Sequence, residues 1–173
     1  MAILSVRNEE TVLEQEEAIA TFLKPYGLSY ERWDISKLER DTSEAATEHE
    51  RILNVFSDEI EQLKSQKGYA TADVIHIKPD LPNLDAMLSK FDKEHLHTED
   101  EVRFVVAGRG VFTIHGEDDK VFDVEVHPGD LLVVPTDTWH WFTLCEDRTI
   151  TCIRLFEDTS GWTPHYREGG MRA

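Results

Sequence analysis

Short apolar runs separated by turn residues dominate the C-terminal part of the chain. Runs of this length, rich in valine, isoleucine and aromatic side chains, are typical of strands, and their regular spacing favours an antiparallel sandwich or barrel. The predicted strands cover residues 72–77, 102–106, 111–115, 121–126, 131–134, 140–144 and 149–156. The pattern therefore predicts a mainly β fold.

The N-terminal part carries a different pattern, in which apolar residues recur at helical spacing. Residues 9–23 and 41–65 are predicted to form helices, and a shorter helix is predicted at 83–91. Asp41 is the predicted N-cap of the second helix, with Glu44 completing a capping box. Each long helix has one apolar side, which indicates that both helices cover the β part.

The chain has 173 residues, a length that fits one compact domain. We expect a single domain over residues 1–173, with no internal repeat. Within it, residues 1–70 are predicted to be mostly helical, 71–156 to form the barrel and 157–173 to form a C-terminal loop or tail.

Charge and composition narrow the choice of partners. The formal charge of −17, from 35 acidic and 18 basic residues, opposes binding to nucleic acid or anionic lipid, so a small molecule is the expected partner. The chain shows no apolar run of bilayer length, and residues 1–10 lack the features of a secretory signal. Cys145 and Cys152 do not suggest a disulfide framework. We therefore expect a cytoplasmic protein, and a monomer.

Side chains that could take part in catalysis or metal binding lie close together in the sequence from residue 95 onward. His95 and His97 are two residues apart, and on a strand this spacing places both imidazoles on one face. Glu101 and Arg103 share that parity if the strand is extended throughout, although a bulge at 98–100 would make the match partly fortuitous. His140 begins a later predicted strand.

Three imidazoles and one carboxylate form a mixed nitrogen and oxygen ligand set, which suits Fe(II), Ni(II), Mn(II), Co(II) or Zn(II) better than Ca(II) or Mg(II). With four protein ligands, a six-coordinate metal keeps two positions for a substrate. A closed structural zinc site is the alternative, but such sites usually draw on cysteine, and neither cysteine lies near the histidines in sequence.

These residues carry a resemblance to the paired motifs of the cupin superfamily. The matching pattern is His95-x-His97-x3-Glu101-x6-Gly108, then Pro128-Gly129-Asp130 and Pro135-x4-His140. The resemblance implies a small antiparallel jelly-roll barrel, here with N-terminal covering helices. It also implies that His95, His97, Glu101 and His140 hold a metal ion in the mouth of the barrel.

Within the cupins, the chain is most similar to the acireductone dioxygenase family of methionine salvage. The similar segments are Lys93–His97, Asp100–Phe104, Gly108–Phe112, Trp139–Phe142 and Arg154–Phe156 followed by Gly161-Trp162. The resemblance implies an oxidoreductase with one Fe(II) or Ni(II) per chain. Its substrates would be O2 and the acireductone 1,2-dihydroxy-3-keto-5-methylthiopentene. The iron form would give 4-methylthio-2-oxobutanoate and formate, and the nickel form methylthiopropionate, formate and CO.

Five further residues become candidates once this activity is assumed. Arg103 is expected to stabilise developing oxyanions, and Glu94 to act as a proton acceptor or to support the ligands. Phe91, Phe142 and Trp162 are expected to line the pocket for the methylthio tail. Core packing is the alternative role for these aromatic residues.

Two other functions stay open, because fold and metal site do not determine the substrate. One is a different cupin metalloenzyme, such as another dioxygenase or a sugar isomerase. The other is a non-catalytic cupin in which the metal serves the structure.

Overall fold

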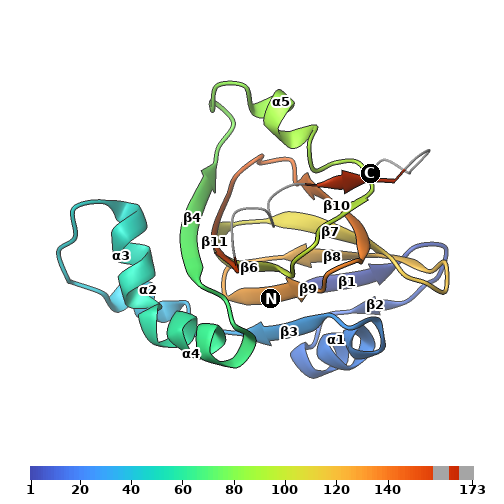
Figure 1. Ribbon diagram of the computed structural model, residues 1–173, viewed down its shortest axis with the longest axis horizontal. Helices are drawn as coiled ribbons and strands as arrows, with labels where there is room; N and C mark the ends of the chain where they lie inside the picture. The colour runs from blue at the N-terminus through green and yellow to red at the C-terminus, as the bar shows by residue number, and fades with distance from the viewer. Residues whose placement is uncertain (158–163, 168–173) are drawn as a thin grey trace.

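The computed structural model describes residues 1–157 and 164–167, and its β-strands form two antiparallel sheets (Figure 1). The seven-stranded sheet contains, in spatial order, β12 (His165–Tyr166), β5 (His95–Leu96), β10 (Trp139–Leu144), β7 (Gly110–His115), β8 (Val121–Val126), β1 (Ile3–Val6) and β2 (Val12–Leu13). The five-stranded sheet contains β3 (Ser29–Arg32), β9 (Asp130–Val134), β6 (Glu101–Gly108), β11 (Ile150–Phe156) and β4 (Thr71–Ile77). The predicted mainly β, cupin-type architecture is confirmed.

The two sheets enclose one hydrophobic core, and a second core lies behind the five-stranded sheet. Strand β9 shows why: its five residues are all buried, with Leu132 and Val134 in the enclosed core and Leu131 and Val133 in the outer one. A sheet covered on both faces requires apolar side chains at consecutive positions, which explains the unbroken apolar run in this strand.

Helices supply the cover for the outer core. Helices α2 (Ser36–Arg40), α3 (Glu48–Val55) and α4 (Ser57–Lys67) lie together beside β4 in Figure 1. Ile52, Phe56 and Ile60 from this group are buried against the five-stranded sheet. The enclosed core is bordered by α1 (Glu16–Leu23), the short 3-10 helix at Lys24–Tyr26 and α5 (Leu84–Leu88). The prediction that helices cover the barrel is confirmed.

The predicted helix over 41–65 was wrong in its start and in its continuity. Thr47 is the N-cap, because its hydroxyl accepts a hydrogen bond from the Glu50 backbone N–H at 3.1 Å. The carboxylate of Asp41 instead accepts from the Ser43 hydroxyl at 2.8 Å. At Phe56 the backbone leaves the helical region, which separates α3 from α4.

The predicted helix over 9–23 begins at residue 16. Val12 and Leu13 pair with β1 as a short edge strand, so backbone pairing outweighs the helical pattern there. Strands β1, β3, β5 and β12 were not predicted. They have four residues or fewer, which leaves little pattern to recognise.

The structure gives the state of the two cysteines and the character of the helices. Cys145 and Cys152 are free cysteines, the latter buried. Among the described residues, none of the helices combines the length and apolar character that crossing a membrane requires.

Candidate metal centre

The four candidate ligands come from both sheets. His95 lies on β5 and His140 on the adjacent β10, directly opposite each other in the seven-stranded sheet. Glu101 begins β6 in the five-stranded sheet, and His97 lies between the two strands. The strand is therefore not extended throughout: of the two possibilities left open by the sequence, the interruption at 98–100 is the one found, because the chain turns there and changes sheets. The ligands converge through tertiary structure and not through shared strand parity.

The turn between β5 and β6 is held by hydrogen bonds to the segment before β10. The Asp100 carboxylate accepts from the Thr136 backbone N–H at 3.1 Å, and the His97 carbonyl accepts from the Asp137 N–H at 3.1 Å. These contacts join the segment that carries His97 to the approach of the strand that carries His140.

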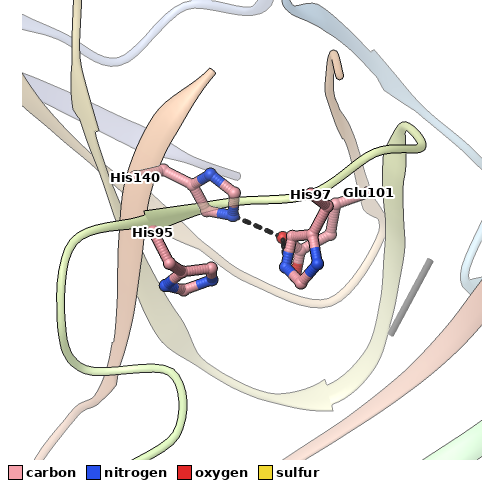
Figure 2. A group of neighbouring side chains, drawn as sticks. All are labelled: His95, His97, Glu101 and His140. Atoms are coloured by element: carbon pink, nitrogen blue, oxygen red, sulfur yellow. Dashed lines mark hydrogen bonds and ion pairs between the residues drawn. The ribbon is translucent and has the colours of Figure 1, made fainter. Parts of the chain in front are cut away.

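The side chains of His95, His97, Glu101 and His140 point toward one another (Figure 2). Each offers one ligand atom, and these atoms all lie within 4.8 Å of one another. Glu101 Oε2 lies 2.5 Å from His140 Nε2 and 3.5 Å from His97 Nε2. The imidazoles are almost completely buried.

Hydrogen bonds set the tautomers of two imidazoles. His95 Nδ1 lies 2.6 Å from the Lys93 carbonyl oxygen, and His140 Nδ1 lies 2.8 Å from that of Thr138. A carbonyl oxygen only accepts, so each Nδ1 carries a proton and each Nε2 is the nitrogen left to bind a metal ion. Burial, followed by the nearby His140, lowers the pKa of His95 to about 4, which keeps that imidazole neutral.

Glu101 is ionised although it is buried. Burial raises the pKa of its carboxyl, but the charge of Arg103 and the contact with His140 outweigh that effect and hold the pKa well below its usual range. Arg103 Nη2 lies 3.0 Å from Oε1, the oxygen turned away from His140. Oε2 is left to face the histidines.

The donor set fits a divalent transition metal ion. It combines neutral imidazole nitrogens with one anionic oxygen in a buried site, which is the ligand chemistry such ions select. It contains no thiolate, the ligand most typical of closed structural zinc sites. The metal site predicted at His95, His97, Glu101 and His140 is confirmed as a cluster.

A small cavity of about 50 Å³ opens beside the cluster and extends into the barrel interior. Its lining is charged at Glu101, Arg103 and Arg154 and mostly apolar elsewhere. The predicted pocket residues Phe91 and Phe142 both line it. Trp162 lies outside the described residues. The full lining is Ile75, Ile77, Phe91, Glu101, Arg103, Phe112, Phe142, Ile150, Cys152 and Arg154.

Several of these lining residues were not singled out from the sequence. Cys152 and Arg154 follow Ile150 at every second position along β11, so strand alternation places all three on the barrel interior. Arg154 lies directly opposite Arg103 on the neighbouring strand, and its guanidinium forms a paired contact with the Asp73 carboxylate at 2.9 and 2.7 Å. The alternation of β11 was a signal that could have identified them.

Glu94 directly precedes β5, and its side chain is not part of the ligand cluster. Its carboxylate accepts from Arg167 Nη1 at 2.5 Å and contacts His115 Nδ1 at 3.1 Å, and it does not line the cavity. Burial raises the pKa of this carboxyl, but the hydrogen bonds from Arg167 and His115 lower it below its ordinary value.

The barrel and its cluster together define a cupin-type metalloprotein, in which three histidines and one glutamate form the metal site. The family model for the ARD/ARD' family matches residues 4–164. The chain therefore belongs to the ARD/ARD' family.

Individual relatives agree along nearly the whole length. The chain is 46% identical to the acireductone dioxygenase of Bacillus pumilus, over 97% of this chain and 98% of the relative. It is 42% identical to that of Bacillus subtilis, over 99% of both chains. A solved structure, acireductone dioxygenase from Bacillus anthracis with a cadmium ion in its active center, is 44% identical with a TM-score of 0.88, covering 96% of this chain and 98% of that one.

Proposed function

We propose that this chain is a metal-dependent dioxygenase that cleaves the acireductone 1,2-dihydroxy-3-keto-5-methylthiopentene with O2 in methionine salvage. The observation that carries the proposal is the convergence of His95, His97, Glu101 and His140 beside a cavity whose lining combines charged and apolar side chains. Its membership of the ARD/ARD' family supports the choice of substrate.

The proposed cofactor is one Fe(II) or Ni(II) per chain, held by the same four side chains. When bound, such an ion supplies Lewis acidity toward the enediol oxygens and access to the chemistry of O2. The cadmium ion in the active center of the Bacillus anthracis relative supports a divalent ion at the corresponding place. We propose that the metal decides the products. Iron would yield 4-methylthio-2-oxobutanoate and formate, and nickel would yield methylthiopropionate, formate and CO.

Arg103 has two proposed roles. Its contact with Glu101 Oε1 holds that carboxylate in the orientation that turns Oε2 to the histidines. Its guanidinium also lines the cavity, where a fixed cation stabilises negative charge on the substrate oxygens as they lose their protons. Its Nη1 donates to the Val102 carbonyl at 3.0 Å, which fixes the guanidinium beside Glu101.

We propose a positioning role for Glu94, one of the two roles expected from the sequence. Its carboxylate is engaged by Arg167 and His115, so a proton acceptor in the cavity is not the role that its contacts support. The pair instead holds the strand that presents His95.

The apolar part of the cavity lining is the proposed site for the methylthio tail. Phe91 and Phe142 belong to this lining, and sulfur packs favourably against aromatic edges. We keep Trp162 as a proposed third member of this pocket.

We also propose that the protein is a cytoplasmic monomer. Light scattering of the purified protein tests its oligomeric state.

Product identification tests the function. Protein purified without added metal is analysed for its native metal, then stripped and reloaded anaerobically with Fe(II) or Ni(II). Each form receives acireductone and O2, and products are identified by NMR and gas analysis. We expect rapid loss of the enediol with the two product sets above. Consumption no faster than in a buffer blank would overturn the dioxygenase proposal.

A matched pair of variants makes the assay specific. His140→Ala removes one ligand and should abolish turnover, because the remaining three side chains no longer complete the site. His127→Ala removes a histidine that contacts Glu125 at 3.0 Å on the surface, away from the cluster, and should leave turnover unchanged. Equal loss in both variants would contradict the assignment of the site.

A further inference from the structure

Gly110 occupies a position where strands rarely use glycine. It begins β7 and pairs with Leu144 on one side and Val126 on the other, and it is buried. Among the described glycines, those with positive φ are Gly27, Gly68, Gly108 and Gly129, so the backbone at 110 does not require glycine. A glycine that is not needed for backbone conformation often marks a close approach of neighbouring atoms.

The neighbouring atoms belong to the substrate cavity. A Cβ placed on Gly110 would lie 2.5 Å from Cζ and 2.6 Å from Cε2 of Phe142, and 3.3 Å from Cδ1 of Ile150. Phe142 and Ile150 both line the cavity beside the metal cluster. The Phe142 ring therefore lies directly against the bare backbone of β7.

The Phe142 ring is in contact with other cavity-lining residues on its inner side. Its backbone N–H donates to the Phe91 carbonyl at 2.8 Å, and its ring packs on Phe112 with centroids 4.9 Å apart. Phe91 and Phe112 are themselves cavity-lining residues. A methyl group at position 110 would thus displace the ring tip from β7, either toward Phe91 and Phe112 in the cavity or toward the surface groove that Phe142 borders with Leu88 and Asp92.

We propose that Gly110 is a specificity-determining residue. Because it has no side chain, Phe142 can lie against β7, and this position of the ring sets the length of apolar tail that the cavity accepts. This inference rests on the proposed function, because the tail in question is the methylthioethyl group of acireductone. Gly110 does not touch the reacting atoms, and acts through the position of Phe142 and Ile150.

The first test is Gly110→Ala. Its KM for acireductone should rise at least about tenfold, the scale of a lost methylene-sized fit in an apolar pocket. An analogue in which a methyl group replaces the methylthioethyl tail should show a KM within about twofold of wild type, because it does not reach the contracted end. kcat for the analogue should be retained. A parallel loss with both substrates, no change, or a gain in preference for the longer tail would overturn the inference.

A rescue variant separates pocket shape from strand damage. Phe142→Leu removes Cζ and Cε2, the atoms nearest to the added methyl group. Gly110→Ala/Phe142→Leu should therefore recover acceptance of the methylthio tail relative to Gly110→Ala. Val111→Ala is the control, because Val111 lies on the same strand but lines a groove with Ser5 and Asp123 on the opposite face. It should leave the substrate preference unchanged.

If Gly110→Ala does not fold, Phe142→Leu alone tests the same limit. It should improve kcat/KM for an ethylthio analogue relative to the methylthio substrate by at least about threefold, and no improvement would overturn the inference.

Binding gives a readout that does not depend on turnover. The metal-loaded proteins are titrated with 4-methylthio-2-oxobutanoate and with pyruvate, and the ratio of the two Kd values is compared between wild type and Gly110→Ala. The ratio should shift at least about fivefold against the longer acid. If wild type does not consume acireductone, the proposed function fails while this ratio still decides the role of Gly110. An unchanged ratio overturns the role while leaving the function intact.

Discussion

At the scale of single residues, Glu101 connects the metal site to the cavity. One carboxylate oxygen faces the histidines and the other contacts Arg103, which itself lines the cavity. Arg103 is only slightly exposed, and its loss would leave the carboxylate without its main compensating charge. Under the proposed function, orientation of a ligand and stabilisation of substrate charge would depend on the same guanidinium.

Arg103→Ala tests this double dependence. We expect kcat/KM for acireductone to fall by about 10²- to 10³-fold, because a fixed positive charge beside the developing oxyanions is lost. Metal affinity should fall by about tenfold or more, because the partner that orients a ligand is removed. Steady-state kinetics and metal titration measure the two effects. Arg109→Ala, which alters a half-exposed arginine, is the control and should change neither value.

At the scale of elements, the two-residue strand β5 depends on its neighbours. β10 pairs with it on one side and β12 on the other, where Tyr166 lies opposite His95. Tyr166 also donates from its hydroxyl to the Lys90 carbonyl at 2.8 Å, and Arg167 reaches the Glu94 carboxylate. The last described strand thus holds the strand that carries a metal ligand.

Arg167→Ala should weaken metal retention while the protein stays folded. The substitution leaves the buried Glu94 with His115 as its remaining partner and loosens the contact between β12 and β5. We expect the metal dissociation constant to rise by about tenfold, the lower end of what outer partners of ligands contribute. Competition with a chelator measures it. Arg148→Ala breaks an exposed pair with Asp85, and an equal change there would contradict the role of Arg167.

Helices α2, α3 and α4 pack on the five-stranded sheet, and none of their residues lines the cavity beside the metal cluster. The Phe56 ring is buried between the helices and the five-stranded sheet, 4.8 Å from the Phe104 ring between centroids. Neither residue lines the cavity beside the metal cluster. Stability and catalysis should therefore respond separately to changes in this region.

Phe56→Ala tests whether stability and catalysis respond separately. We expect the free energy of unfolding to fall by about 3–5 kcal/mol, because a large buried ring is replaced by a cavity. Chemical denaturation measures the loss. The activity of the folded fraction at low temperature should match wild type, and a large fall in kcat of the folded protein would show that the outer core influences the site.

At the scale of the whole molecule, the four metal ligands belong to neither of the two hydrophobic cores. The enclosed core and the outer core are built from apolar side chains of both sheets and the helices. The metal ligands add four polar side chains at one place in the barrel. The fold should therefore persist without metal, as expected of an enzyme site and not of a structural metal centre.

Metal removal tests this expectation. Binding at a thousandfold excess over Kd stabilises a protein by about 4 kcal/mol. For a chain of this size we therefore expect the Tm to fall by about 10 °C on removal. Circular dichroism should retain the β signature, and reloading should restore both Tm and activity. Loss of the folded spectrum in the metal-free protein would support the non-catalytic alternative, in which metal serves structure.

The sequence by itself determined the longer strands and the identity of the metal ligands. Strands β6 to β11 carry apolar patterns long enough to recognise, and the ligand types and spacings match a cupin pattern. Predictions failed where local signals were short or ambiguous. The start of α1 follows a short pairing of Val12 and Leu13 with β1, and β5 and β12 depend on pairing partners far away in the chain.

Only the tertiary structure decided how the site is assembled. His95 and Glu101 belong to different sheets, Glu94 faces away from the cavity, and Gly110 lies against Phe142. The physical reason is that side-chain alternation specifies a face within one strand, whereas convergence across sheets depends on turns and packing between distant segments. Spacing in the sequence therefore identified the ligands, and the closed barrel brought them together.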